Sequence, residues 1–108
     1  MEPIETSTFT RRVTALLSDE DYGEFQSPLA SNPGLGDPIE GGGGIRKIRV
    51  AVGSRGKRGG ARVIYYRAVR KDWILLLYVY AKNVSADLTP WQVAQLAKVV
   101  KEEFRDES

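Results

Sequence analysis

The sequence predicts an α+β fold in which two N-terminal helices precede an antiparallel-type sheet of three to four strands, followed by a C-terminal helix. Apolar residues recur at helical spacing before residue 30 and again after residue 89. Between residues 45 and 80, alternating or β-branched segments indicate strands. Strands grouped between helices are typical of an α+β layer structure. A chain of 108 residues is expected to form one domain, residues 1–108.

The first helix is predicted to begin at Thr8, acting as N-cap. Its apolar stripe is Phe9, Val13, Leu16 and Leu17, at i, i+4, i+7 and i+8.

The second helix is predicted to follow Ser18, since Asp19, Glu20 and Asp21 suit the positive end of a helix dipole. Pro28 lacks an N–H and clashes one turn back, so we expect this helix to kink or to end near Ser27. The glycine-rich stretch 32–44 is predicted to be a connecting loop. It matches neither of the glycine-rich phosphate-binding motifs.

Three strands are predicted at Ile45–Val52, Ala61–Val69 and Trp73–Tyr80. In the first, alternation places Ile48 and Val50 on one face and Lys47 and Arg49 on the other. The third is apolar on both faces, as expected of a buried strand. The short segment 70–72 predicts a hairpin between the last two strands. Residues 4–6 would add a short edge strand.

The C-terminal helix has strong start signals. Thr89 is the predicted N-cap, Pro90 occupies the first helical position, and Gln92 completes a capping box. The stripe predicted to pack on the sheet is Val93, Leu96, Val100 and Phe104.

Charge is strongly segregated along the chain. Residues 1–40 carry two bases and eight acids, residues 41–82 carry eleven bases and one acid, and residues 83–108 carry three bases and five acids. The central net charge is therefore +10, between flanks of −6 and −2. Such asymmetry favours a nucleic acid or another phosphate-rich partner, whereas a merely solubilising surface would mix the two signs.

Composition excludes several kinds of chemistry. The chain has no cysteine and no histidine, which removes thiol chemistry, the usual general base and the commonest metal ligand. No carboxylate pair lies in the basic region, so neither a metal site nor a cofactor is expected. No apolar run approaches a membrane span, and the acidic N-terminus lacks a signal-peptide pattern. We therefore expect a cytoplasmic protein without membrane contact.

Four bases are predicted to converge at one side of the sheet: Lys47, Arg49, Arg62 and Lys82. We call these four residues the basic cluster. Further candidates for contact with a nucleic acid are Arg46, Arg55, Lys57, Arg58 and Trp91. Clustered like charges require a counterion, which favours a phosphate ligand. For any single one of these bases, an ordinary solvated position remains an equal alternative.

Three segments carry a family resemblance: the stretch from Gly41 through GKRGGARVIYY, the later YAKN and the final DLTPWQ. They resemble the RelE/HigB group of toxin ribonucleases from bacterial type II toxin–antitoxin systems. The resemblance covers nearly the whole chain and implies a RelE-like fold. It also implies a metal-independent endoribonuclease that cleaves messenger RNA on the ribosome and thereby inhibits translation. In this chemistry the ribose 2′-OH attacks the adjacent phosphate and the 5′-oxygen leaves.

The resemblance also implies roles for the basic cluster. Arg62 would stabilise charge on the phosphate oxygens, Lys47 or Arg49 would hold the phosphate, and Lys82 would stabilise or protonate the leaving oxygen. The general base and acid stay unassigned.

One departure from the family concerns a tyrosine near the C-terminal helix, where this chain has Trp91. An indole cannot act as a base, so we expect Trp91 to pack the helix start, with stacking on an RNA base as the alternative. The missing tyrosine keeps open a second interpretation, in which the protein binds RNA or the ribosome without cutting. In a variant of it, the protein is an inactive toxin that acts mainly through antitoxin and operator binding.

Expected partners are the ribosome with its messenger RNA and a cognate antitoxin. The antitoxin is expected to be a helix-turn-helix, DNA-binding protein, and operator DNA would be reached only through it.

Overall fold

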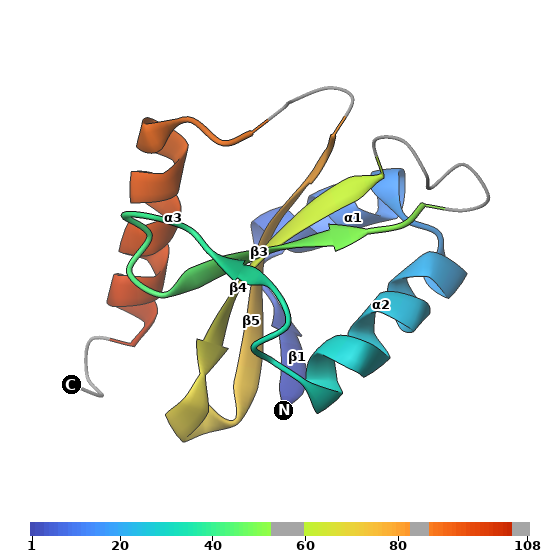
Figure 1. The fold of residues 1–108 in the computed structure, drawn as a ribbon, viewed down its shortest axis with the longest axis horizontal. Helices are drawn as coiled ribbons and strands as arrows, with labels where there is room; N and C mark the ends of the chain where they lie inside the picture. Colours follow the sequence, from blue (N-terminus) through green and yellow to red (C-terminus); the bar gives the residue numbers. More distant parts are fainter. Residues whose placement is uncertain (53–59, 83–86, 105–108) are drawn as a thin grey trace.

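The computed structural model describes residues 1–52, 60–82 and 87–104. Its elements, in chain order, are β1 (Glu2–Glu5), α1 (Ser7–Leu16), α2 (Asp19–Ser31), β2 (Asp37–Pro38), β3 (Ile45–Val50), β4 (Ala61–Ala68), the 3₁₀ turn η2 (Val69–Lys71), β5 (Trp73–Ala81) and α3 (Pro90–Glu103). Helices α1 and α2 lie on one side of the sheet and α3 on the other (Figure 1). The predicted α+β class is confirmed.

The sheet has five strands among the described residues, in the order β1-β5-β4-β3-β2, rather than the predicted three to four. All neighbours are antiparallel except β1, which pairs parallel to β5 from Glu2↔Trp73 to Glu5↔Leu76. The predicted edge strand therefore exists, two residues earlier than expected. The two-residue strand β2 was not predicted, because it lies in the glycine-rich loop and carries no strand pattern.

A β-bulge in β5 decides which side chains face α3. Tyr65 pairs with Leu76, whereas the preceding Ile64 pairs with Tyr78, so Leu77 has no partner of its own. Before the bulge, Ile74 and Leu76 pack under α1 and α2. With strict alternation Tyr80 would face the same way, but the extra residue turns it to the α3 face.

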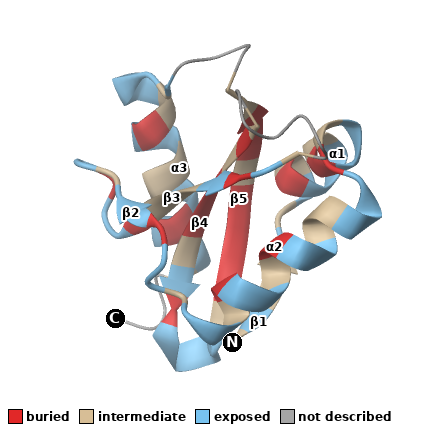
Figure 2. Cartoon of the chain, turned by 45° about the vertical axis from the view of Figure 1, so that its right-hand side comes forward, coloured by how far each residue is buried: buried red, intermediate tan, exposed pale blue. Residues whose placement is uncertain are grey.

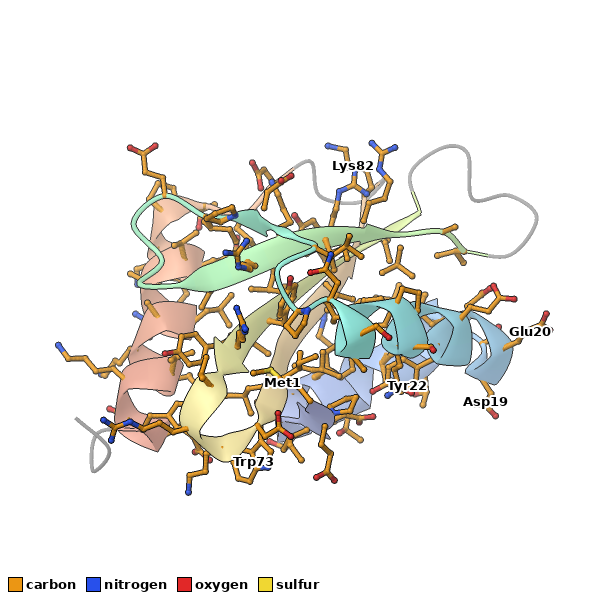
Figure 3. The ribbon with its side chains drawn as sticks, turned by 60° about the horizontal axis from the view of Figure 1, so that its bottom comes forward. Met1, Asp19, Glu20, Tyr22, Trp73 and Lys82 are labelled. Carbon is orange, nitrogen blue, oxygen red and sulfur yellow. The ribbon has the colours of Figure 1, made fainter. Side chains whose placement is uncertain are left out.

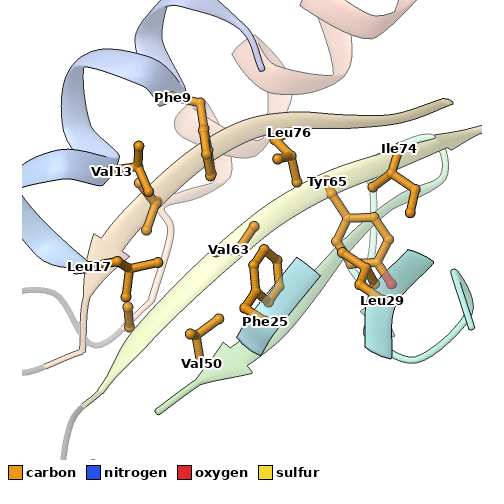
Figure 4. Close-up of a cluster of buried hydrophobic side chains, with 12 residues drawn as sticks. Phe9, Val13, Leu17, Phe25, Leu29, Val50, Val63, Tyr65, Ile74 and Leu76 are labelled. Carbon is orange, nitrogen blue, oxygen red and sulfur yellow. The ribbon is translucent and has the colours of Figure 1, made fainter. Parts of the chain in front are cut away.

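The face under α1 and α2 is a continuous apolar core (Figure 4). Tyr65 is the largest fully buried side chain of this core, and its hydroxyl makes two hydrogen bonds. The Gly36 N–H donates to this oxygen at 2.9 Å, and the hydroxyl donates to the Pro33 carbonyl at 2.7 Å. These two bonds hold the loop that follows α2 against the sheet.

The face under α3 has a second core, made by Ile45, Ile64, Leu75, Leu77, Tyr80, Val93 and Val100. Strands β4 and β5 are buried over most of their length, while the outer surfaces of the helices are exposed (Figure 2). The predicted stripe of the last helix thus packs on the sheet, and its capping box between Thr89 and Gln92 is present.

One helix prediction was wrong in detail, and for a second helix one of the two predicted alternatives, an end near Ser27, is excluded. The N-cap of α1 is Thr6, whose hydroxyl accepts the Phe9 N–H, and not Thr8. Helix α2 runs through Pro28 to Ser31. Pro28 is exposed, so the backbone hydrogen bond that it removes is lost on the solvent side of the helix. The neighbouring Phe25 and Leu29 are buried and hold both halves of the helix on the sheet.

The outer edge of β5 is closed by side chains where β1 ends. The Thr6 hydroxyl donates to the Leu77 carbonyl at 3.2 Å, and Arg12 Nε donates to the Val79 carbonyl at 2.7 Å. The Arg12 guanidinium also lies 4.5 Å from the centre of the Tyr78 ring. No helix in the described part of the chain is long and apolar enough to cross a membrane.

Candidate functional site

Strands β3 and β4 bring two arginines directly opposite each other. The register pairs Arg49 with Arg62, and Lys47 lies two residues earlier on the same face of β3. These side chains lie on the face of the sheet that α3 covers. Ile45 alternates in phase with Lys47 and Arg49 on β3, and Ile64 with Arg62 on β4, and both isoleucines lie in the core under α3. Opposed like charges destabilise a sheet, so this arrangement calls for an anionic partner.

Strand β5 continues this row. Arg62 pairs on its other side with Tyr80, so Arg49, Arg62 and Tyr80 cross three strands side by side. Lys82 follows β5 directly, and its N–H donates to the Gly60 carbonyl at 3.1 Å. Figure 3 shows Lys82 at one end of β5, far from Trp73 at the other end. Three strands thus bring the basic cluster to one end of the sheet.

Lys47 is not a free cation in this structure. Its Nζ lies 3.2 Å from Asp87 Oδ1, which also accepts the Leu88 N–H at 2.9 Å. The Leu88 N–H, followed by Lys47, lowers the pKa of the Asp87 carboxyl below its usual range, and the charge of Lys82 adds to this. Asp87 is therefore a carboxylate counterion inside the basic cluster.

A cleft of about 490 Å³ lies beside this ion pair, between β2 and the start of α3. It is lined by Lys47 together with the carboxylates of Asp37, Glu40 and Asp87. This cleft is acidic overall and does not suit a polyanion.

The remaining RNA-binding candidates lie elsewhere or outside the described residues. Arg46 points to the opposite face of β3 from Lys47, and its Nη1 donates to the Gly36 carbonyl at 2.7 Å, where it holds the loop. Trp91 is 69% exposed, so it does not pack the helix start as expected. Its side chain is available for stacking. The predicted candidates Arg55, Lys57 and Arg58 lie outside the described residues.

Tyr80 is the residue that sequence reasoning missed. It is 2% exposed, and its hydroxyl is buried without a hydrogen-bond partner among the described residues. Burial raises the pKa of this phenol, as does the charge of Asp87, and Arg62 opposes the shift. Strict alternation along β5 would place Tyr80 under α1 and α2, and no residue pattern announces the bulge at Leu77 that turns it to the α3 face.

The described residues contain no group of three or more metal-ligating side chains placed to hold a metal ion. What they offer instead is a set of cationic and neutral hydrogen-bond donors at one end of the sheet. Guanidinium groups bind phosphate oxygens through two parallel hydrogen bonds, and ammonium groups bind them as point charges. The arrangement can bind a phosphodiester and stabilise additional negative charge on it.

The chain was compared with models of protein families. Residues 9–107 match the family model described as RelE toxin of the RelE/RelB toxin–antitoxin system. The match covers α1 from Phe9 onward, α2, β2 to β5 and α3, and its range includes every residue of the basic cluster. Because the match spans most of the chain and the fold agrees with it, the chain belongs to the RelE toxin family.

Proposed function

We propose that this protein is a ribosome-dependent messenger RNA endonuclease that inhibits translation until an antitoxin neutralises it. The observation that carries the proposal is the pairing of Arg49 with Arg62, with Lys47 on the same face and Lys82 nearby. Like charges placed side by side in this way destabilise the sheet unless a polyanion neutralises them. Membership of the RelE family makes RNA the polyanion of choice.

In the proposed reaction the ribose 2′-oxygen attacks the adjacent phosphorus while the bond from phosphorus to the 5′-oxygen breaks. The 2′-OH loses its proton and the departing 5′-oxygen gains one. Arg62 would hold two phosphate oxygens and stabilise the charge that grows on them, with Lys47 or Arg49 fixing the phosphate. Lys82 would stabilise or protonate the leaving oxygen. Exposed Trp91 is available to stack on a neighbouring base.

The partner that the family implies is a RelB-type antitoxin. We propose that it covers the basic cluster, or blocks ribosome entry, through an acidic or amphipathic segment. The central net charge of +10 supports this complementarity. Whether the antitoxin carries a helix-turn-helix stays a prediction.

The experiment adds purified protein, pretreated with EDTA, to ribosomes translating a defined message in their normal magnesium buffer. We expect cleavage that yields a 2′,3′-cyclic phosphate or 3′-phosphate on one fragment and a 5′-OH on the other. A 5′-phosphate product would contradict the mechanism. An intact message, with the protein bound to the ribosome, would favour the binding-only alternative.

A further inference from the structure

Two buried tyrosines differ in the hydrogen bonding of their hydroxyl groups. Tyr65 and Tyr80 are 0% and 2% exposed and lie on neighbouring strands. The Tyr65 hydroxyl has a donor and an acceptor at 2.9 and 2.7 Å. The Tyr80 hydroxyl has neither, and it is the single buried side-chain polar atom without a partner in the described part of the chain.

An unpaired buried hydroxyl is costly, because it loses its hydrogen bonds to water and gains none. A phenylalanine at position 80 would fill the same space without that cost. Buried groups of this kind are rare in folded proteins and call for a specific explanation. The position of Tyr80 supplies one, because the bulge at Leu77 turns the ring to the α3 face, directly beside Arg62.

Tyr80 lies in the apolar core under α3, but charged groups of the basic cluster and Asp87 act on its phenol. Arg62 and Asp87 both act on the phenol electrostatically, and Asp87 is in turn bonded to Lys47 and affected by Lys82. A carboxylate is thus already paired with one member of the basic cluster, Lys47, in the RNA-free protein. Its side chain is 65% exposed, and an ion pair this exposed to water is weak, so another anion can displace it readily.

We propose that Tyr80 is an RNA contact residue, whose hydroxyl donates a hydrogen bond to a phosphate oxygen that displaces Asp87 from the basic cluster. This rests on the proposed function and names one more residue of its site. Because the phenol stays protonated, Tyr80 acts as a donor and not as a base. Asp87 then serves as an internal counterion, which holds Lys47 in place and is exchanged for the phosphate.

The test compares Tyr80→Phe with the matched control Tyr65→Phe. Each variant loses one oxygen from a buried ring on adjacent strands. Two quantities are measured for each: the thermal midpoint, and the affinity for a 2′-O-methyl RNA oligonucleotide, which cannot be cut. Cleavage of a translated message is measured in parallel.

Tyr80→Phe should leave the midpoint unchanged or raise it, while RNA affinity falls about 10- to 100-fold, the worth of one hydrogen bond to a charged group. Tyr65→Phe should lower the midpoint by about 4–8 °C, because it orphans the Gly36 N–H, with RNA affinity unchanged. Asp87→Asn should raise RNA affinity about fivefold, the effect of one charge about 4 Å away in water.

Equal RNA affinity of Tyr80→Phe and the wild type would overturn the inference. So would a fall in its midpoint equal to that of Tyr65→Phe, since the hydroxyl would then have a partner within the fold. If the wild type binds the oligonucleotide but cuts no message, the proposed nuclease activity is lost. The affinity difference at Tyr80 still decides this inference in that case.

Discussion

Neighbouring residues of β4 belong to two different environments. Val63 and Tyr65 lie in the core under α1 and α2, where apolar packing is continuous and the one buried hydroxyl is doubly bonded. Arg62 and Ile64 point to the other face, where α3 covers an apolar core but leaves the end of the sheet to charged side chains. One strand therefore presents an apolar core on one side and, on the other, a core that ends in the basic cluster.

Because the two faces differ in this way, substitutions on one face should have different effects from substitutions on the other. Changes under α1 and α2 should alter the free energy of unfolding, whereas changes in the basic cluster should alter RNA cleavage in a protein that still folds. The predictions below test that separation.

The largest effect is expected for Phe9→Ala. Phe9 is 0% exposed and packs between α1 and the sheet, so its loss removes apolar burial and leaves a cavity. The free energy of unfolding should fall by about 3–5 kcal/mol, measured by urea denaturation. A loss under 1 kcal/mol would mean that this face is not the principal core.

Arg62→Ala should reduce messenger RNA cleavage about 10²–10³-fold, as is usual when one donor to transition-state charge is removed. Its stability should stay the same or rise, because the repulsion from Arg49 is relieved. The control is Arg67→Ala, which removes the same charge from an exposed position at the other end of β4. Equal cleavage by both variants would refute the role of Arg62.

Thr89→Ala tests the element that covers the basic side of the sheet. The Thr89 hydroxyl accepts the Gln92 N–H at 3.1 Å, and the Gln92 side chain accepts the Thr89 N–H at 2.8 Å. Losing this cap should cost about 1 kcal/mol in urea denaturation. Ser at the same position retains the hydroxyl and should restore most of the loss; failure of Ser to do so would point to a packing role instead.

The smallest effect concerns pH. The pKa of Asp87 is lowered in the folded protein, so its ionised form stabilises the fold above the unfolded pKa near 4. This contribution is lost as pH falls through the lower folded pKa. Because the pair is solvent-exposed, we expect only about 0.2–1 kcal/mol. In urea titrations, the free energies of unfolding of the wild type and Asp87→Asn should differ by this amount at pH 6 and become equal near pH 2. A difference in stability that does not change with pH would show that ionisation of Asp87 is not its cause.

The sequence predicted most of the architecture, because helix stripes, the capping box at Thr89 and the three long strands all have local signals. It also placed Lys47, Arg49 and Arg62 on one side of the sheet, since strand alternation needs only the order of residues. What it missed depends on tertiary contacts. Helix α2 continues past Pro28 because residues on either side of the proline are buried, and the two-residue strand β2 exists only through its pairing with β3.

Tyr80 shows the same limit within the site. Its direction is set by a one-residue irregularity in β5, and the absence of a partner for its hydroxyl can be seen only in three dimensions. The ion pair of Lys47 with Asp87, 40 residues apart, was missed for the same reason.

The parallel pairing of β1 with β5 has a consequence for how the protein forms. Thr6 bonds to Leu77, 71 residues later in the chain, so the first strand can join the sheet only after nearly all of the others have been synthesised. Contacts this distant in sequence raise the contact order and slow folding. Strand β5, which carries Tyr80 and ends at Ala81 directly before Lys82, has β1 as its edge partner. A newly made chain therefore passes through a stage in which all its basic residues exist but β1 has not yet joined the sheet.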